Sequence, residues 1–191
     1  MAGLSLMLRR GGLAPHPVGN DYVKFEDDGV FSILMNKGVS SDGVGITRDD
    51  MAKLVDIAKW FAGSSIRKFN ELQFTAVKSL ANGAFANCSY LEEIILPDSV
   101  TTLYANCFQG TNLKVLAFPK ALKTAQWHIL YNSISAPIIV SYNPTPPTLD
   151  NETFKNATLG GVYVPDESMA AYKAAYVWNR YSLKPLSEFN Q

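Results

Sequence analysis

The sequence has few of the side chains that usually build catalytic and metal centres. Among 191 residues there are two cysteines, Cys88 and Cys107, and two histidines, His16 and His128. The cysteines lie outside any C-x-x-C motif and are too few for a disulfide framework, and no His-x-x-x-His spacing is present. The sequence therefore predicts no cofactor and no metal, with both cysteines as reduced packing residues.

Charge and long apolar runs are also scarce. Charged residues make up 18% of the chain, and seventeen basic residues balance seventeen acidic ones. A neutral chain has no electrostatic reason to bind nucleic acid or an anionic membrane. No stretch approaches the ~20 apolar residues of a membrane span. Leu4-Ser-Leu-Met-Leu8 is shorter than a signal-peptide core, and Arg9-Arg10 follows it instead of preceding it. We therefore expect cytosolic synthesis without a membrane span or signal peptide.

The sequence does contain a repeat. Leu91-Glu-Glu-Ile-Ile-Leu-Pro97 recurs as Leu113-Lys-Val-Leu-Ala-Phe-Pro119, with each apolar position and the proline 22 residues later. Extending this period predicts five rungs, at about residues 69–74, 91–96, 113–118, 135–140 and 159–164. A period of 20–29 residues with an L-x-x-L-x-L core is typical of leucine-rich solenoids, whose stacked rungs pair their strands in parallel. The predicted fold class is an α/β repeat, a short leucine-rich-repeat solenoid.

The residues before the repeats predict an arm and an N-terminal unit. Residues 1–20 are rich in glycine and proline and are expected to form an extended arm. Two apolar stretches within 22–35 flank Asp-Asp-Gly, which predicts a β-hairpin. Thr47-Arg-Asp-Asp50 is a capping box that opens a helix predicted to run to residue 62. This hairpin–helix unit, residues 21–65, is expected to cover one end of the solenoid.

The residues after Pro165 predict a cap for the other end. Asp166 is the expected N-cap of a helix with Met169, Tyr172 and Tyr176 on one face. The solenoid with its C-terminal capping helix is thus expected to occupy residues 66–191.

The repeats resemble a known family. The stretch from Ala84 to Val100, AFANCSYLEEIILPDSV, resembles the BspA-like leucine-rich repeat found in many surface proteins of gut and oral bacteria. The stretch from Val162 to Ala175, VYVPDESMAAYKAA, is similar to the terminal rung and capping helix of that family. The resemblance covers about residues 66–185 and implies the same solenoid. The arm, with Leu6-Met-Leu-Arg-Arg10, resembles the short arms that open some structural proteins of phages and prophages of gut bacteria.

The sequence offers little catalytic chemistry. Cys88 and His128 are expected two rungs apart, and a dyad of these two residues is the enzymatic alternative, a thiol hydrolase. Glu92 and Glu93 are adjacent on a strand and point to opposite faces, so they do not form an acid–base pair. We therefore predict a non-enzymatic protein.

The candidate functional residues lie on the surface between the core positions. The column between the second and third core positions contains Gln73, Ile95, Ala117, Ile139 and Tyr163. Such a column reflects either β-propensity alone or an apolar docking patch for another protein. Exposed tyrosines would add contact area, namely Tyr90, Tyr104, Tyr131 and Tyr142. Leu4, Leu6 and Leu8 form an apolar tip on the arm, either a docking element or a simple terminus.

These observations favour a non-enzymatic interaction or structural module. The expected partners are other proteins, in a homo- or hetero-oligomeric assembly, and not nucleic acid. The first setting is a larger particle such as a phage virion or tail, to which the arm would attach. The alternative is a secreted or cell-surface adhesin that binds a host protein or glycan.

Overall fold

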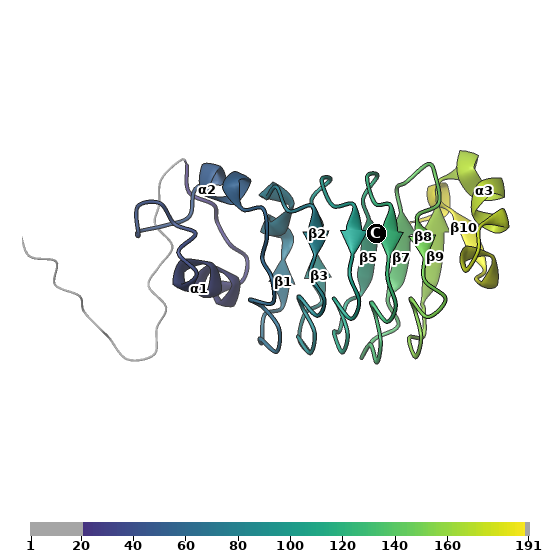
Figure 1. Cartoon of the computed structure of the whole chain (residues 1–191), viewed down its shortest axis with the longest axis horizontal. Helices are drawn as coiled ribbons and strands as arrows, with labels where there is room; N and C mark the ends of the chain where they lie inside the picture. Colours follow the sequence, from purple (N-terminus) through teal and green to yellow (C-terminus); the bar gives the residue numbers. More distant parts are fainter. Residues whose placement is uncertain (1–20, 190–191) are drawn as a thin grey trace, which may run out of the picture.

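The chain winds into a stack of similar coils between two end units (Figure 1). The computed structural model describes residues 21–189. One sheet joins short strands in the order β2 (Ser79–Leu80), β4 (Thr102–Leu103), β6 (Thr124–Ala125) and β8 (Thr148–Leu149). A second sheet joins β5 (Val115–Phe118), β7 (Ile138–Ser141), β9 (Gly161–Val164) and β10 (Leu183–Pro185), and β1 (Lys68–Phe69) pairs with β3 (Glu93–Ile94). All of these pairs are parallel, which confirms the predicted leucine-rich solenoid.

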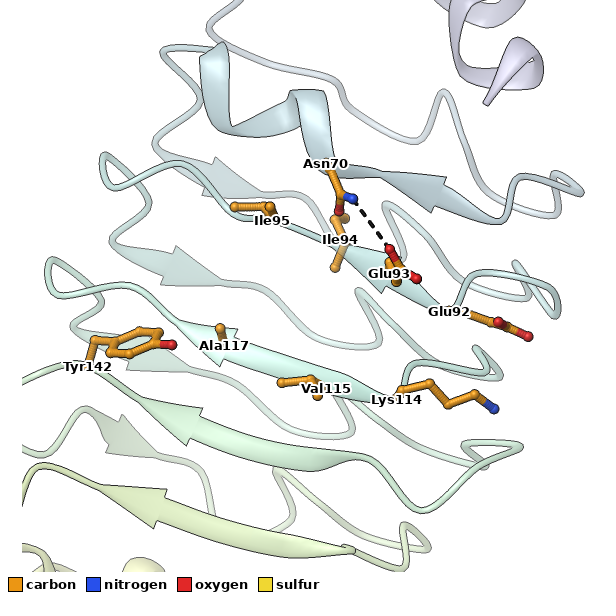
Figure 2. Close-up of a pocket in the computed structure, with 9 residues that line it drawn as sticks. All are labelled: Asn70, Glu92, Glu93, Ile94, Ile95, Lys114, Val115, Ala117 and Tyr142. Atoms are coloured by element: carbon orange, nitrogen blue, oxygen red, sulfur yellow. Dashed lines mark hydrogen bonds between the residues drawn. The ribbon is translucent and has the colours of Figure 1, made fainter. Parts of the chain in front are cut away.

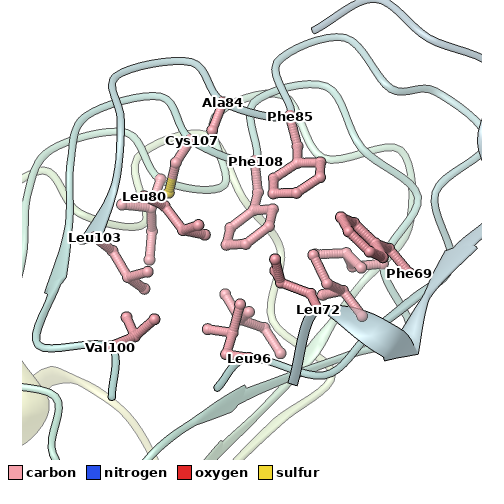
Figure 3. Close-up of a cluster of buried hydrophobic side chains, with 14 of the residues drawn as sticks. Phe69, Leu72, Leu80, Ala84, Phe85, Leu96, Val100, Leu103, Cys107 and Phe108 are labelled. Carbon is pink, nitrogen blue, oxygen red and sulfur yellow. The ribbon is translucent and has the colours of Figure 1, made fainter. Parts of the chain in front are cut away.

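One rung cannot bury its apolar edge alone, so the core is built from columns that run through the stack. The repeated positions Leu91, Ile94 and Leu96 and their copies Leu113, Leu116 and Phe118 are all buried. A second column lies in the six-residue turns between the sheets and contains Phe61, Phe85, Phe108, Leu130 and Phe154. The rings of Phe61, Phe85 and Phe108 stack at centroid distances of 5.4 and 5.5 Å, and Figure 3 shows the last two within the aliphatic core.

Each of these turns ends in a left-handed residue. The positions are Gly63, Asn87, Gly110, Asn132 and Asn156, with φ between 53° and 72°. Glycine and asparagine tolerate this conformation, whereas a β-branched side chain is strained in it. The turn that ends at Gly63 shares both the phenylalanine and the glycine with the later turns, so the repeated geometry begins before Phe69.

The N-terminal unit contains a helix where a β-hairpin was predicted, so that prediction is wrong. Helix α1 spans Asp28–Asn36, and the Asp27 side chain caps it by accepting a hydrogen bond from the Gly29 amide at 2.8 Å. Capping by Asp27 and burial of the helix face that carries Val30 and Leu34 outweigh the local strand pattern. The expected helix of residues 47–62 is also shorter.

Helix α2 spans only Arg48–Lys53, although the predicted capping box is confirmed. The Thr47 side chain accepts from the Asp50 amide at 3.1 Å, and the Asp50 carboxylate accepts from the Thr47 amide at 2.9 Å. The chain becomes extended at Leu54 because the next residues must enter the first repeat turn. Both helices lie at the N-terminal end of the stack (Figure 1).

The strand register differs from the predicted one in the fourth rung. Leu116 pairs with Ile139, and Ala117 pairs with Val140. An extra residue before β7 lengthens that step to 23 residues, and a one-residue shift exchanges the two faces of a strand. Ile139 is therefore fully buried in the core, and its prediction as an exposed interaction residue is wrong. In the first rung, the 3-10 helix η1 (Asn70–Phe74) replaces most of the expected strand.

The C-terminal cap is a compact unit of short helices and one strand. It contains η2 (Asp166–Ser168), α3 (Met169–Ala174), η3 (Trp178–Arg180), strand β10 and η4 (Leu186–Glu188). Buried Tyr172 donates its hydroxyl proton to the Asn143 carbonyl at 2.8 Å, and the Trp178 indole donates to the Pro147 carbonyl at 2.8 Å. Asp166 was predicted to be an N-cap, and that prediction is wrong. Its carboxylate instead accepts hydrogen bonds from the amide and hydroxyl of Ser187.

Across residues 21–189, no helix is long and apolar enough to cross a bilayer.

Candidate functional site

The outer face of the strands near the N-terminal unit carries a shallow groove. The groove has a volume of about 530 Å³ and is lined by residues from η1, β3, β5 and the neighbouring loops. Its lining consists of Asn70, Glu92, Glu93, Ile94, Ile95, Lys114, Val115, Ala117 and Tyr142 (Figure 2). The charged side chains lie near the starts of the strands, and Ile95, Ala117 and Tyr142 lie further along them.

A shared ion pair forms the end of the groove that faces the N-terminal unit. The Lys68 ammonium lies 3.0 Å from a Glu93 carboxylate oxygen and 3.6 Å from one of Glu26. The Asn70 amide donates to both carboxylates, at 3.3 and 3.4 Å. The hydrogen bond with Glu93 raises the pKa of Lys68. Because one ammonium serves two carboxylates, this end keeps an excess of negative charge.

A second polar group lies at the same end of the strands. Asn112 donates to the Glu92 carboxylate at 3.2 Å, and Lys114 donates to the Asn112 side-chain oxygen at 3.3 Å. Glu92 and Glu93 thus bind different partners, as expected for neighbouring strand residues. Around the groove, three carboxylates face two ammonium groups.

The apolar part of the groove is open to solvent. The side chain of Ile95 is 43% exposed and that of Tyr142 is 39% exposed, while Val115 and Ala117 between them are half-buried. Exposed apolar side chains that lie side by side form a continuous apolar patch. Two predicted residues, Ile95 and Ala117, therefore lie together in this groove.

Toward the C-terminal end, the outward column is covered, whereas Gln73 at its N-terminal end is exposed. Val140 takes the place predicted for Ile139 and is fully buried. Tyr163 is half-buried, with the Phe189 ring 5.0 Å from its own and the Lys184 ammonium 5.5 Å from its ring centre. The structure thus separates Tyr163 from the open groove, and Leu4, Leu6 and Leu8 lie outside the described residues.

Sequence reasoning missed several groove residues. Val115 lies two positions before Ala117, so the alternation of side chains along β5 was a usable signal for it. Glu26 and Lys68 had no such signal, because only the folded N-terminal unit brings them to Glu93.

The cysteines and histidine lack the features of a catalytic site. The buried Cys88 thiol donates to the Phe61 carbonyl at 2.9 Å, and burial raises its pKa, which is the opposite of activation. Burial also raises the pKa of Cys107. His128 instead contacts Glu152, with 3.1 Å between its Nε2 and a carboxylate oxygen. Within residues 21–189, no cluster of three or more His, Cys, Asp or Glu residues is arranged for a metal ion.

The fold and sequence pattern define the class of protein. Parallel rungs at intervals of 21 to 25 residues, with an apolar edge turned inward, form a leucine-rich-repeat solenoid. The model of the BspA type leucine rich repeat region matches residues 58–181 in six copies, so the chain belongs to this family. The match begins at the turn that ends with Gly63. A comparison with curated proteins gave no match.

Membership of this family supports a coarse functional statement. Leucine-rich repeats mediate contacts between proteins, and repeats of this family are typically non-enzymatic. Proteins with BspA-type repeats are often found at the cell surface or outside the cell.

Proposed function

We propose that this chain is a non-enzymatic docking module that binds an extended protein segment in the groove around Ile95, Val115 and Ala117. The observation that carries the proposal is the open apolar floor of this groove beside an acidic end. Exposed aliphatic side chains lose unfavourable contact with water when a partner covers them.

The chemistry of the groove selects the partner. Apolar side chains of the ligand would cover Ile95 and Ala117, and Tyr142 would add aromatic contact area. A basic side chain would neutralise the excess charge of Glu26, Glu92 and Glu93 over the two lysines. The preferred ligand is therefore an apolar segment with an adjoining arginine or lysine.

Two biological settings are compatible with this role. The surface or extracellular location of many proteins with this repeat favours a cell-surface adhesin that binds a host protein. Incorporation into a larger particle, such as a phage virion or tail, is the second setting. Antibody labelling of intact cells of the native host, compared with sedimentation of particles from the same culture, separates the two.

A displayed library of random ten-residue peptides tests the docking site. We expect enriched sequences that combine apolar and basic residues and bind at least about tenfold more weakly to Ala117→Glu, because a new carboxylate in the floor of the groove is desolvated on binding. Lys123→Glu, on the opposite sheet, is the matched control and should bind like the unmodified chain. Enriched peptides that bind Ala117→Glu as tightly as the unmodified chain, or a library with no enriched peptide, would contradict the proposal.

A further inference from the structure

We infer that the sheet formed by β2, β4, β6 and β8 carries a second binding site, which takes a glycan that bears carboxylate groups. This sheet lies opposite the docking groove, so the two sites are separate. Three features of its outer face support the inference: a groove with two lysines, a row of hydroxyl groups, and an exposed tyrosine.

The lysine groove lies at the start of strands β6 and β8 and is lined by residues 120–123, 143, 145–148 and Thr101. Its volume is about 620 Å³. Within residues 21–189, Lys120 and Lys123 are the charged residues of its lining, and neither ammonium has a carboxylate oxygen within 4.0 Å. The groove is thus a local excess of positive charge on a chain that is neutral overall, and it favours an anionic ligand.

The walls of the lysine groove are held in place by hydrogen bonds. The buried Asn143 amide donates to the Leu122 carbonyl at 2.6 Å and so joins the two walls. The second wall is also tied to the C-terminal cap, because Tyr172 donates to the Asn143 carbonyl and Trp178 donates to the Pro147 carbonyl. A groove that is rigid before binding loses little conformational entropy when a ligand enters it.

A row of hydroxyl groups extends from the groove across the sheet. Parallel pairing aligns Ser79, Thr102, Thr124 and Thr148 on successive strands, and the residue after each of them is buried, so these four side chains face outward. Neighbouring positions in the row are about 4.8 Å apart. Because Thr148 also lines the lysine groove, the groove and the row form one surface. Each hydroxyl can donate and accept a hydrogen bond, as the hydroxyl groups of a sugar do.

Tyr104 adds a flat apolar surface to the same face. It lies two residues after Thr102, so it points to the same side of the sheet, and it is 41% exposed. A pyranose ring has a face of C–H groups that packs against an aromatic ring. The Lys123 amide donates to the Thr101 carbonyl, which places Lys123 about 10 Å from Tyr104 along the strand direction. A glycan that runs from Tyr104 to the groove therefore contacts the tyrosine, the hydroxyl row and the lysines.

The composition of this face favours a glycan over other anions. Affinity for nucleic acid rests mainly on many contacts between cations and phosphates, whereas two lysines line this groove and Asp150 follows Thr148 by two residues. An acidic peptide has no hydroxyl-rich surface to match the row. A chain of neutral and carboxylated sugars uses the lysines, the hydroxyl groups and the tyrosine together.

Fluorescence anisotropy with the full-length chain and a labelled hyaluronan hexasaccharide tests this site. The probe carries a carboxylate on every second sugar, and chitohexaose is an uncharged probe of the same length. We expect the hyaluronan probe to bind at least about tenfold more tightly than chitohexaose. Lys120→Gln with Lys123→Gln should weaken hyaluronan binding at least about tenfold, and Tyr104→Ala should weaken it roughly threefold or more.

Matched variants control for total charge and for exposed aromatic area. Lys37→Gln with Lys184→Gln removes the same charge from two exposed positions outside this sheet, and Tyr90→Ala removes another exposed tyrosine. Both controls should bind hyaluronan like the unmodified chain. Circular dichroism of each variant verifies that the solenoid is intact.

Several outcomes would overturn the inference. These are no binding at about 1 mM probe, equal binding of chitohexaose, and equal losses in the two lysine pairs. Tighter binding of a hexaglutamate peptide or a single-stranded DNA hexamer, lost in Lys120→Gln with Lys123→Gln, would overturn it as well and assign the groove to an acidic protein or a nucleic acid. If hyaluronan binding fails while peptide binding still depends on Ala117, the docking groove stands and only the second site is wrong.

Discussion

Replacing Phe85 by alanine tests whether the stacked rings hold the solenoid together. Phe85 is fully buried, and its ring lies 5.4 Å from that of Phe61 and 5.5 Å from that of Phe108. Phenylalanine-to-alanine changes in cores cost about 3–5 kcal/mol, because transfer energy and cavity energy add. Because rings flank Phe85 on both sides, the site has little room to collapse, and we expect the upper part of that range.

The chain supplies its own control for this experiment. Position 130 of the same column is a leucine, so Phe85→Leu keeps a side chain that the repeat already accepts. We expect a cost of about 1–2 kcal/mol for Phe85→Leu, from lost ring contacts and slight underpacking. Urea unfolding followed by circular dichroism gives both values, and an unchanged m value verifies that the transition remains cooperative.

Double variants make the test specific to stacking. Phe85→Ala and Phe108→Ala should deviate from additivity by about 0.5–1.5 kcal/mol, because these rings touch. Phe85→Ala and Phe154→Ala should add to within about 0.5 kcal/mol, because three rungs, or about 14 Å, separate them. A cost below about 1 kcal/mol for Phe85→Ala, or equal coupling in both pairs, would refute the nearest-neighbour reasoning.

Two further changes test buried polar groups. Glu71 is buried and accepts from the Glu26 amide at 2.8 Å, and burial raises its pKa, so the folded state holds this proton to higher pH than the unfolded chain does. Stability from this group is therefore lost as pH rises from the ordinary glutamate pKa through the folded pKa. In urea unfolding between pH 4 and 7, the free energy of unfolding of Glu71→Gln should therefore increase relative to that of the unmodified chain as pH rises. A difference that stays constant with pH would contradict this. Tyr172→Phe removes the hydrogen bond to the Asn143 carbonyl and should lower the free energy of unfolding by about 1–2 kcal/mol, measured by thermal unfolding. Tyr176 is exposed, so the control Tyr176→Phe should change stability little. Equal effects of the two changes would count against a role for the buried hydroxyl.

The repeat could be predicted well because each core position recurs in several repeats of the sequence. Leu91, Ile94 and Leu96 recur as apolar residues one period later. Agreement between successive rungs therefore distinguishes the repeat from a chance apolar pattern in a single rung. The family match and the parallel strands confirm this part of the prediction. A single amphipathic segment carries no such redundancy, and the errors accordingly lie outside the regular repeats.

The N-terminal unit shows what local patterns leave out. The stretch around Asp27 has both turn and strand character, but its carboxylate caps α1 and also accepts from the Arg67 amide at 2.5 Å. This contact joins segments forty residues apart, which no local pattern contains. The register error has a similar origin, because one extra residue before β7 leaves the composition of the rung unchanged while it turns Ile139 inward.

The candidate site was predictable only where it belongs to the repeat. Ile95 and Ala117 follow from their places between core positions. Glu26 and Lys68 reach the groove because α1 and the first rung pack together, so the acidic end depends on tertiary structure. The part of the proposed site that would select a ligand is thus the part that the repeat pattern does not encode.

The C-terminal cap explains why the groove is confined to the first half of the outer sheet face. Strand β10 extends the sheet beyond β9, and the following residues place Phe189 against Tyr163. Val140, one rung earlier, is already fully buried, whereas Ile95 remains open. The cap that closes the core at one end therefore also covers part of the outer face at Tyr163, whereas Ile95 stays exposed toward the acidic N-terminal unit. Under the proposed function, charge selection and apolar contact would then occur at one place on this face.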